Sequence, residues 1–156
     1  MTTALAAALV RPVAAADFAQ WLALWDGYNA FYGRAGPSAL PAEITWATWL
    51  RFLDAGESVQ ALVAEAEGRL VGLAHYLFHR STICIEPVCY LQDLYTAENA
   101  RGAGIGRRLI GAVAECARAA GSRRLYWQTH ESNHTARRLY ETLAERSGFI
   151  VYRREL

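Results

Sequence analysis

The sequence predicts an α/β protein built as a mixed β-sheet with helices packed on its faces. Hydrophobic residues make up 53% of the 156 positions and charged residues 20%, which is typical of a globular chain that buries a two-layer core. The apolar pattern changes between helical spacing and strand alternation in the order strand, two helices, three strands, helix, strand, helix, strand. There is no repeat, low-complexity tract or linker, so we expect a single domain over residues 1–156.

The N-terminal third is expected to hold one strand and two helices. A short apolar stretch over 5–10 is the candidate strand. The first helix should begin near Asp17, because a first helical turn favours a negative charge, and should end near Gly33. Pro41 is suited to the start of the second helix, which should end near Gly56.

Residues 59–78 are typical of two strands folded into a hairpin at Glu67-Gly68. A third strand is expected over 88–96. Later elements are a helix after the glycine-rich 101–106 stretch that closes on Gly121, a strand over 124–129, a helix over 133–145 capped by Ser132 or Asn133, and a final strand over 149–156.

Charge and composition exclude several classes of function. The net charge of +1 gives no broad basic field for nucleic acid, and no apolar run approaches the roughly 18 residues of a membrane span. The N-terminus lacks the basic start of a secretory signal, and the three cysteines show no CxxC spacing. We therefore expect a cytoplasmic protein that binds neither nucleic acid nor membrane. The histidine pair at 130 and 134 spans a predicted strand–helix junction, so no metal site is expected.

The stretch "RGAGIGRRL" at 101–109 places three glycines in five positions directly before a helix. Each glycine costs about 1 kcal/mol of helix stability against alanine, so the run favours close approach of the backbone or positive φ. Consecutive N–H groups at a helix start bind phosphate, and arginines flank these. The pattern lacks the lysine of a Walker loop and the third glycine of a Rossmann fingerprint. A pyrophosphate is the expected ligand.

This Arg-x-x-Gly-x-Gly pattern resembles the acetyl-coenzyme A signature of the GNAT (GCN5-related N-acetyltransferase) family. "YLQDLYTAENARG" is similar to the family's fourth strand, and "ESNHTARRLY" is similar to its later Asn–Ala–Tyr motif. The match is nearest to the subgroup of yeast histone and D-amino-acid acetyltransferases and of spermidine/spermine acetyltransferase. The resemblance implies a splayed, mostly antiparallel sheet and an acetyl-CoA-dependent N-acetyltransferase. A non-catalytic acetyl-CoA sensor or docking module is the alternative.

The resemblance also implies roles for individual residues. Tyr140 matches the tyrosine that protonates the departing thiolate and contacts the coenzyme. From spacing alone, Tyr140 is equally suited to an apolar helix face. The expected acetyl-CoA site consists of Leu94, Tyr95, Thr96, Arg101, Gly102, Ala103, Gly104, Ile105, Gly106, Arg107, Asn133 and Tyr140.

The general base stays open. Related polyamine enzymes carry Glu where this chain has Gln92, and a glutamine side chain accepts no proton at neutral pH. Gln92 can still hold a water or the amine. Glu131 or His130 could act through water, whereas Asp93 points to the opposite face of a regular strand and is equally suited to a structural role. Gln128 or Thr129 is expected to orient the substrate.

The acceptor pocket should come from the first helix and the loop after it. Aromatic walls with one carboxylate suit a cationic amine, which points to Trp25, Asp26 and Tyr28, with Tyr32 beside them. These aromatic residues could equally pack on the sheet, and Arg34 could meet a substrate carboxylate. We expect a small-molecule amine, amino-acid-like or polyamine-like, ahead of a peptide amine. The final strand could complete its sheet in a partner subunit, so we expect a homodimer.

Overall fold

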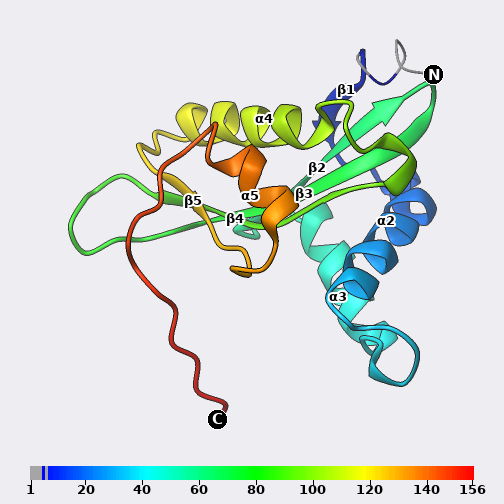
Figure 1. Cartoon of the computed structure of the whole chain (residues 1–156), viewed down its shortest axis with the longest axis horizontal. Coiled ribbons are helices and arrows are strands. Elements are labelled where there is room, and N and C mark those ends of the chain that lie inside the picture. Colours follow the sequence, from blue (N-terminus) through cyan, green and yellow to red (C-terminus); the bar gives the residue numbers. More distant parts are fainter. Residues whose placement is uncertain (1–4, 6) are drawn as a thin grey trace.

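The computed structural model describes Leu5 and residues 7–156 (Figure 1). Its centre is a five-stranded sheet in the order β1-β2-β3-β4-β5. The strands are β1 (Leu9–Pro12), β2 (Val59–Ala66), β3 (Arg69–His79), β4 (Val88–Thr96) and β5 (Leu125–Trp127).

The first four strands pair antiparallel and the last pair is parallel. The predicted hairpin is confirmed, since β2 and β3 are joined at Glu67 and Gly68, whose φ angles are +50° and +76°. Sheets of this kind need a crossover between parallel strands, and here the crossover is the helix between β4 and β5.

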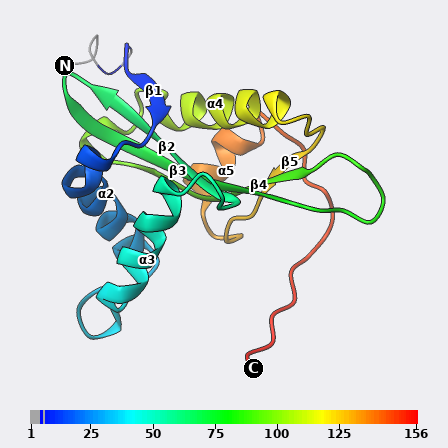
Figure 2. The ribbon, with the colours of Figure 1, turned by 180° about the vertical axis from the view of Figure 1, so that it is seen from behind.

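Helices cover both faces of the sheet, as predicted (Figures 1 and 2). On one face lie α2 (Phe18–Phe31) and α3 (Ala42–Leu53), where Trp21, Trp25 and Trp49 share a core cluster with Val63 and Leu73. On the other face α4 (Ile105–Ala119) packs through Ile105, Leu109 and Val113. The short helix α5 (His134–Tyr140) lies next to α4 and adds Leu139 and Tyr140 to the same core.

Helix α4 lies close to the sheet above Gly72 of β3. A Cβ atom at Gly72 would lie 2.9 Å from the Ile105 side chain, 3.0 Å from that of Leu109 and 3.0 Å from the Tyr95 carbonyl oxygen. Carbon atoms normally meet at about 3.5–4.0 Å. The missing side chain therefore lets the first turn of α4 lie directly on the strand.

Asp17 marks the start of the first helix for a reason that the sequence did not reveal. Its carboxylate accepts two hydrogen bonds from the Arg11 guanidinium, at 2.7 and 2.9 Å, and one from the Ala14 N–H at 2.8 Å. The Arg11 guanidinium is the main reason that the pKa of Asp17 lies below its usual value. This ion pair ties β1 to α2, with Glu65 of β2 on the other side of Arg11.

Several predicted boundaries were wrong. No strand forms over 149–156; the segment runs away from the sheet in an extended path, with Phe149 and Tyr152 93% and 88% exposed (Figure 1). A run of apolar residues forms a strand only where it pairs with a neighbouring strand, and 149–156 pairs with none of the described strands. The last helix ends at Tyr140 rather than at 145. The first strand occupies Leu9–Pro12 rather than the predicted 5–10; residue 6 of that predicted range lies outside the described residues.

No helix in the described part of the chain is long and apolar enough to cross a membrane.

Candidate active site

The parallel pair β4–β5 separates after only three residue pairs. Pairing runs from Cys89↔Leu125 to Leu91↔Trp127, although β4 continues to Thr96. At the same point β4 carries a bulge, because Leu91 pairs with Tyr76 and Asp93 with His75, which leaves Gln92 as the extra residue. We call this opening between Gln92 and Gln128 the fork.

A small cavity of about 40 Å³, the inner cavity, lies in the fork. Tyr140 lines it from α5, and the Tyr140 ring meets the Trp127 ring at 5.5 Å in an edge-on contact. Burial raises the pKa of Tyr140 to about 12, so its hydroxyl keeps its proton at neutral pH and can donate it. The complete lining is Tyr28, Tyr32, Leu91, Gln92, Leu94, Trp127, Gln128 and Tyr140.

The glycine-rich loop lies where the sequence predicted it, between the end of β4 and the first turn of α4. Gly102 and Gly104 have φ angles of +78° and +80°, and Gly104 is the N-cap of α4. In the described part of the chain, no backbone carbonyl accepts a hydrogen bond from the N–H groups of 102–107. These donors and the positive end of a 15-residue helix fit a pyrophosphate. This is the group by which acetyl-CoA would be held.

The other predicted coenzyme residues are distributed around this loop. Leu94 lines the inner cavity, and Thr96 ends β4. Tyr95 packs under α2 and beneath the Arg101 guanidinium, 5.9 Å from its ring centre. Gly106 lies in the first turn of α4, close to Leu139 and Thr96, and Arg107 donates to Thr142 at 2.8 Å. The side chain of Ile105 is buried in the core, so only its backbone can face a ligand.

The wall formed by α2 differs from the sequence prediction. Trp25 is buried, stacked between Trp21 at 5.8 Å and Tyr28 at 5.3 Å, and belongs to the core rather than to a pocket. Asp26 is exposed and lines neither of the two cavities. Helical geometry explains both, because the face that carries Trp21, Trp25 and Tyr28 turns toward the sheet and Asp26 lies off it. Of the predicted acceptor residues on α2, Tyr28 and Tyr32 reach the inner cavity.

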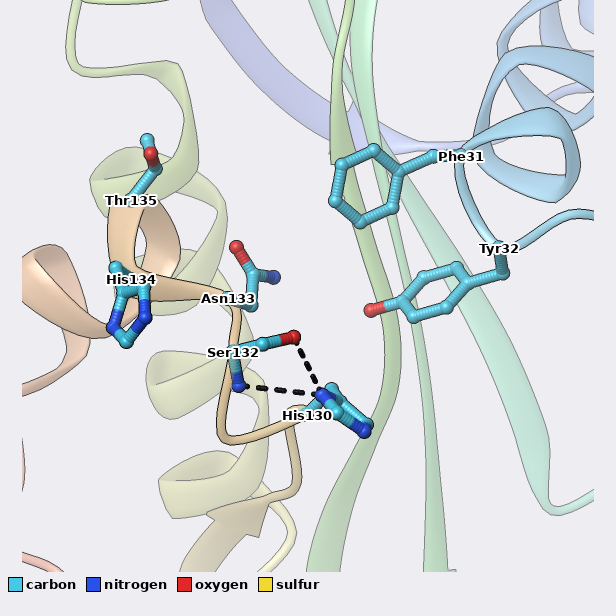
Figure 3. A pocket seen from close by; sticks show the side chains of 7 residues that line it. All are labelled: Phe31, Tyr32, His130, Ser132, Asn133, His134 and Thr135. Carbon is cyan, nitrogen blue, oxygen red and sulfur yellow. Dashed lines mark hydrogen bonds between the residues drawn. The ribbon is translucent and has the colours of Figure 1, made fainter.

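A wider opening of about 550 Å³, the outer cleft, lies between the end of α2 and the loop from β5 to α5. Figure 3 shows Phe31 and Tyr32 on one side, facing His130, Ser132 and Asn133 on the other. His130 Nδ1 lies 2.6 Å from Ser132 Oγ. Phe31 and Thr135 were not predicted as site residues, His134 was considered only as a metal ligand, and Ser132 was predicted only as a helix cap. The spacing of Phe31 from Tyr28 on α2 was the available signal. All lining residues are Phe31, Tyr32, His130, Ser132, Asn133, His134 and Thr135.

The remaining predicted polar residues lie at different distances from the cavities. Glu131, a candidate base, is exposed and lines neither cavity, and its backbone carbonyl accepts a hydrogen bond from Arg137 at 2.8 Å. Gln92 and Gln128 both line the inner cavity. The Asn133 carboxamide caps α5. Asp93 lies on the α2 side of β4, 11% exposed, where it pairs with His75. No cluster of metal-binding side chains occurs among the described residues.

Both halves of the site belong to one short run of chain, from the fork at Gln92 to the helix start at Gly104. The N–H groups of the glycine-rich loop thus follow the same end of β4 at which the fork opens. This combination is the one expected of an N-acetyltransferase.

Residues 21–144 match the acetyltransferase (GNAT) family, and the chain belongs to this family. It is 34% identical over 148 residues to the D-amino-acid N-acetyltransferase HPA3 of Saccharomyces cerevisiae, covering 94% of this chain and 89% of that protein. A 72-residue part, 45% of this chain and 49% of the relative, is 39% identical to the aminoglycoside N(6')-acetyltransferase type 1 of Serratia marcescens.

Solved structures share the fold at lower identity. The aminoglycoside acetyltransferase AAC(6')-Iy with a bisubstrate analogue of CoA superposes with a TM-score of 0.80 at 19% identity, over 96% of this chain and 98% of that one. A transcriptional regulator from Bacillus halodurans gives 0.79 at 20% identity, over 96% and 99%. The predicted mixed, mostly antiparallel sheet is thus confirmed.

Proposed function

We propose that this protein, as one domain over residues 1–156, transfers the acetyl group of acetyl-CoA to the primary amine of a small molecule. The observation that carries the proposal is the pairing of the helix start at Gly104 with a fork that is lined by the partly buried Tyr140. The relatives support it, since one acts on D-amino acids and another on aminoglycosides, as their names state.

The backbone from Gly102 to Arg107 would hold the coenzyme's pyrophosphate, with Arg101 and Arg107 beside it. Leu94, Thr96 and Asn133 would contact the rest of the coenzyme around the fork. Acetyl-CoA supplies an activated acyl group and a thiolate that leaves. The Tyr140 hydroxyl is the chain's proton donor for that thiolate, because its proton is retained at neutral pH and the ring lines the inner cavity.

The geometry favours an acceptor with one ammonium and one carboxylate. Neither set of cavity-lining residues contains a carboxylate, so a polycationic polyamine would meet little charge there. Arg34 lies at the edge of the same site, with its guanidinium 5.7 Å from the Tyr28 ring and 5.5 Å from the Tyr32 ring. Its Nε donates to Asn29 at 2.7 Å, which leaves the other donors for a substrate carboxylate. An amino acid fits this arrangement.

A product-mass assay tests the function. Acetyl-CoA is incubated with the protein and a panel of D- and L-amino acids, polyamines and a lysine-rich peptide, while coenzyme A binding is measured by calorimetry. We expect an amino acid to be the preferred acceptor and Arg34→Gln to raise its KM with little change in kcat. A preferred polyamine would overturn the assignment of substrate class. Coenzyme binding without acetylation of any acceptor would instead indicate a sensor or docking module.

We further propose a homodimer in which residues 149–156 pair with the partner. Phe149, Ile150, Val151 and Tyr152 are all more than 60% exposed, and β5 forms an open edge of the sheet. Deletion of 149–156 should give a monomer by light scattering at a concentration where the full chain is a dimer. A full chain that is monomeric throughout would contradict the proposal.

The compartment we propose is the cytoplasm, because Cys84, Cys89 and Cys116 are free thiols. With a net charge of +1, nucleic acid is not a proposed partner.

A further inference from the structure

A string of buried polar side chains connects three elements beneath the acceptor side of the site. The Trp21 indole of α2 donates through Nε1 to His75 Nε2 of β3, at 3.0 Å. His75 Nδ1 lies 2.9 Å from the Asp93 carboxylate of β4. Trp21 and His75 are 0% and 1% exposed, so water does not take the place of these partners. Buried polar groups of this kind must be satisfied by one another.

The tryptophan fixes the protonation of the histidine. An indole N–H can only donate, so His75 Nε2 must accept and carries no proton. The proton of the neutral ring is then on Nδ1, where it points to Asp93. In a doubly protonated ring, the Nε2–H of His75 and the Nε1–H of Trp21 would both be donors and could not form this hydrogen bond. His75 is therefore a neutral donor to Asp93, and the carboxylate is the acceptor of this string.

The bulge at Gln92 brings this carboxylate beneath α2. Because Gln92 is the extra residue, Asp93 pairs with His75 and takes the face that α2 covers. Tyr28 of α2 lies within electrostatic range of Asp93, since burial and then the charge of this carboxylate raise the pKa of Tyr28. Tyr28 also lines the inner cavity. Polar side chains thus lead from Asp93, which is 11% exposed, by way of Tyr28 to the cavity that Tyr140 also lines.

We propose that Tyr28 and Asp93 together take the proton from the acceptor ammonium, with His75 and Trp21 as positioning residues that hold Asp93 in place. The ammonium gives one proton to the Tyr28 oxygen while the Tyr28 proton moves to Asp93. The neutral amine then forms the C–N bond as the C–S bond breaks, and Tyr140 protonates the thiolate. The acylated nitrogen loses its second proton, which replaces the one that Tyr140 gave, and Asp93 releases its proton to solvent. One proton is therefore released per acetyl group transferred, and atoms and charges balance.

This assignment rests on the proposed function and answers the problem that Gln92 raises. At pH 7, removing the proton from an alkyl ammonium with a pKa of about 10.4 costs roughly 4–5 kcal/mol of free energy. A carboxylate held ready within one hydroxyl of the amine offsets part of this cost, where Gln92 cannot. Ionisable groups around Asp93 come from every neighbouring element: His75 of β3, Tyr90 of β4, Tyr28 and Tyr32 of α2, and Arg34 after it.

The test is the pH dependence of kcat/KM for the preferred acceptor amine. With a base, the enzyme uses the abundant ammonium form, so the wild-type profile should be flat from about pH 6 to the pKa of the amine. Asp93→Asn should react only with amine that solvent has already deprotonated. Its rate should be about 10²-fold lower near pH 7 and should rise about tenfold per pH unit up to the amine pKa.

Two further variants keep the test independent of folding. Tyr28→Phe preserves the stack on Trp25 and removes only the hydroxyl, so it should show the same slope as Asp93→Asn. Tyr90→Phe is the matched control. Asp93 also contributes to the raised pKa of Tyr90, but Tyr90 lines neither cavity, so this variant should keep the wild-type profile. For an acceptor amine whose own pKa lies below neutrality, the deficits of Asp93→Asn and Tyr28→Phe should largely disappear.

The outcomes separate this inference from the proposed function. Flat profiles in both Asp93→Asn and Tyr28→Phe, parallel to that of the wild type, would show that the string is structural and would overturn the inference while acetylation stands. A slope in Tyr28→Phe alone, should Asp93→Asn fail to fold, still supports it. If the wild type acetylates no amine at any pH while binding coenzyme A, the proposed function itself fails.

Discussion

The contact between α4 and β3 can be tested by adding a single methyl group. In Gly72→Ala the new Cβ would lie 2.9–3.0 Å from two side chains and one carbonyl oxygen. Relief to an ordinary contact of about 3.5–4.0 Å requires the first turn of α4 to move by roughly 0.5–1 Å. Overpacking of this kind costs about 1–3 kcal/mol, and replacing glycine in a strand returns about 0.5–1 kcal/mol.

We expect a net loss of about 1–2 kcal/mol in the free energy of unfolding. For a chain of this size that corresponds to a Tm lower by about 2–8 °C in a thermal melt followed by circular dichroism. Because Ile105 is the first residue of α4, the displacement also moves the glycine-rich loop. The Kd for coenzyme A, measured by calorimetry, should therefore rise in the same variant.

Gly111→Ala is the matched control for this experiment. Gly111 lies inside α4, is exposed, and would place its Cβ in open space. The alanine should raise stability by up to about 1 kcal/mol through helix propensity and leave the coenzyme Kd unchanged. If Gly72→Ala were as stable as the wild type and bound coenzyme A equally well, the close approach would have no energetic consequence and the reasoning would be refuted.

Three more predictions address other parts of the molecule. Tyr140→Phe should retain coenzyme A binding and lower turnover by about 10²-fold, and unchanged turnover with chemistry rate-limiting would assign Tyr140 to the core alone. Gly104→Glu should abolish coenzyme binding by placing bulk and negative charge in the loop, to be measured by calorimetry against Gly111→Ala. Arg11→Met should cost about 1–3 kcal/mol of unfolding free energy at pH 7. Since the pKa of Asp17 is lower in the folded state, this ion pair stabilises the fold above the unfolded pKa near 4 and is lost as pH falls further, so acid titrations of the two proteins should converge.

Local signals in the sequence predicted the elements whose geometry depends on neighbours along the chain. Glu67-Gly68 predicted the hairpin because positive φ at a tight turn is a local requirement. The glycines before α4 predicted the loop for the same reason. Tyr140 could be placed on a helix, but its position opposite Tyr28 in one cavity follows only from the tertiary fold.

Features that depend on distant parts of the chain were not predictable. No residue type near Gln92 signals the bulge, which arises from pairing with β3 and redirects Asp93. Trp21 and His75 are 54 positions apart, so their hydrogen bond has no sequence signature. The apolar run at 149–152 predicted a final strand, and this prediction was wrong, because pairing with a neighbouring strand is a property of the assembled sheet that the local sequence does not show.

Residues that line the outer cleft can be substituted with little effect on the stability of the fold. Phe31 and Tyr32 are 57% and 41% exposed, and the facing loop around His130 is exposed as well. Substitutions at such positions typically shift stability by no more than about 0.5 kcal/mol. The string beneath them, by contrast, is buried and tolerates little change. Selection for a different acceptor amine can therefore change the exposed residues of the outer cleft one at a time, while Trp21, His75 and Asp93 stay the same.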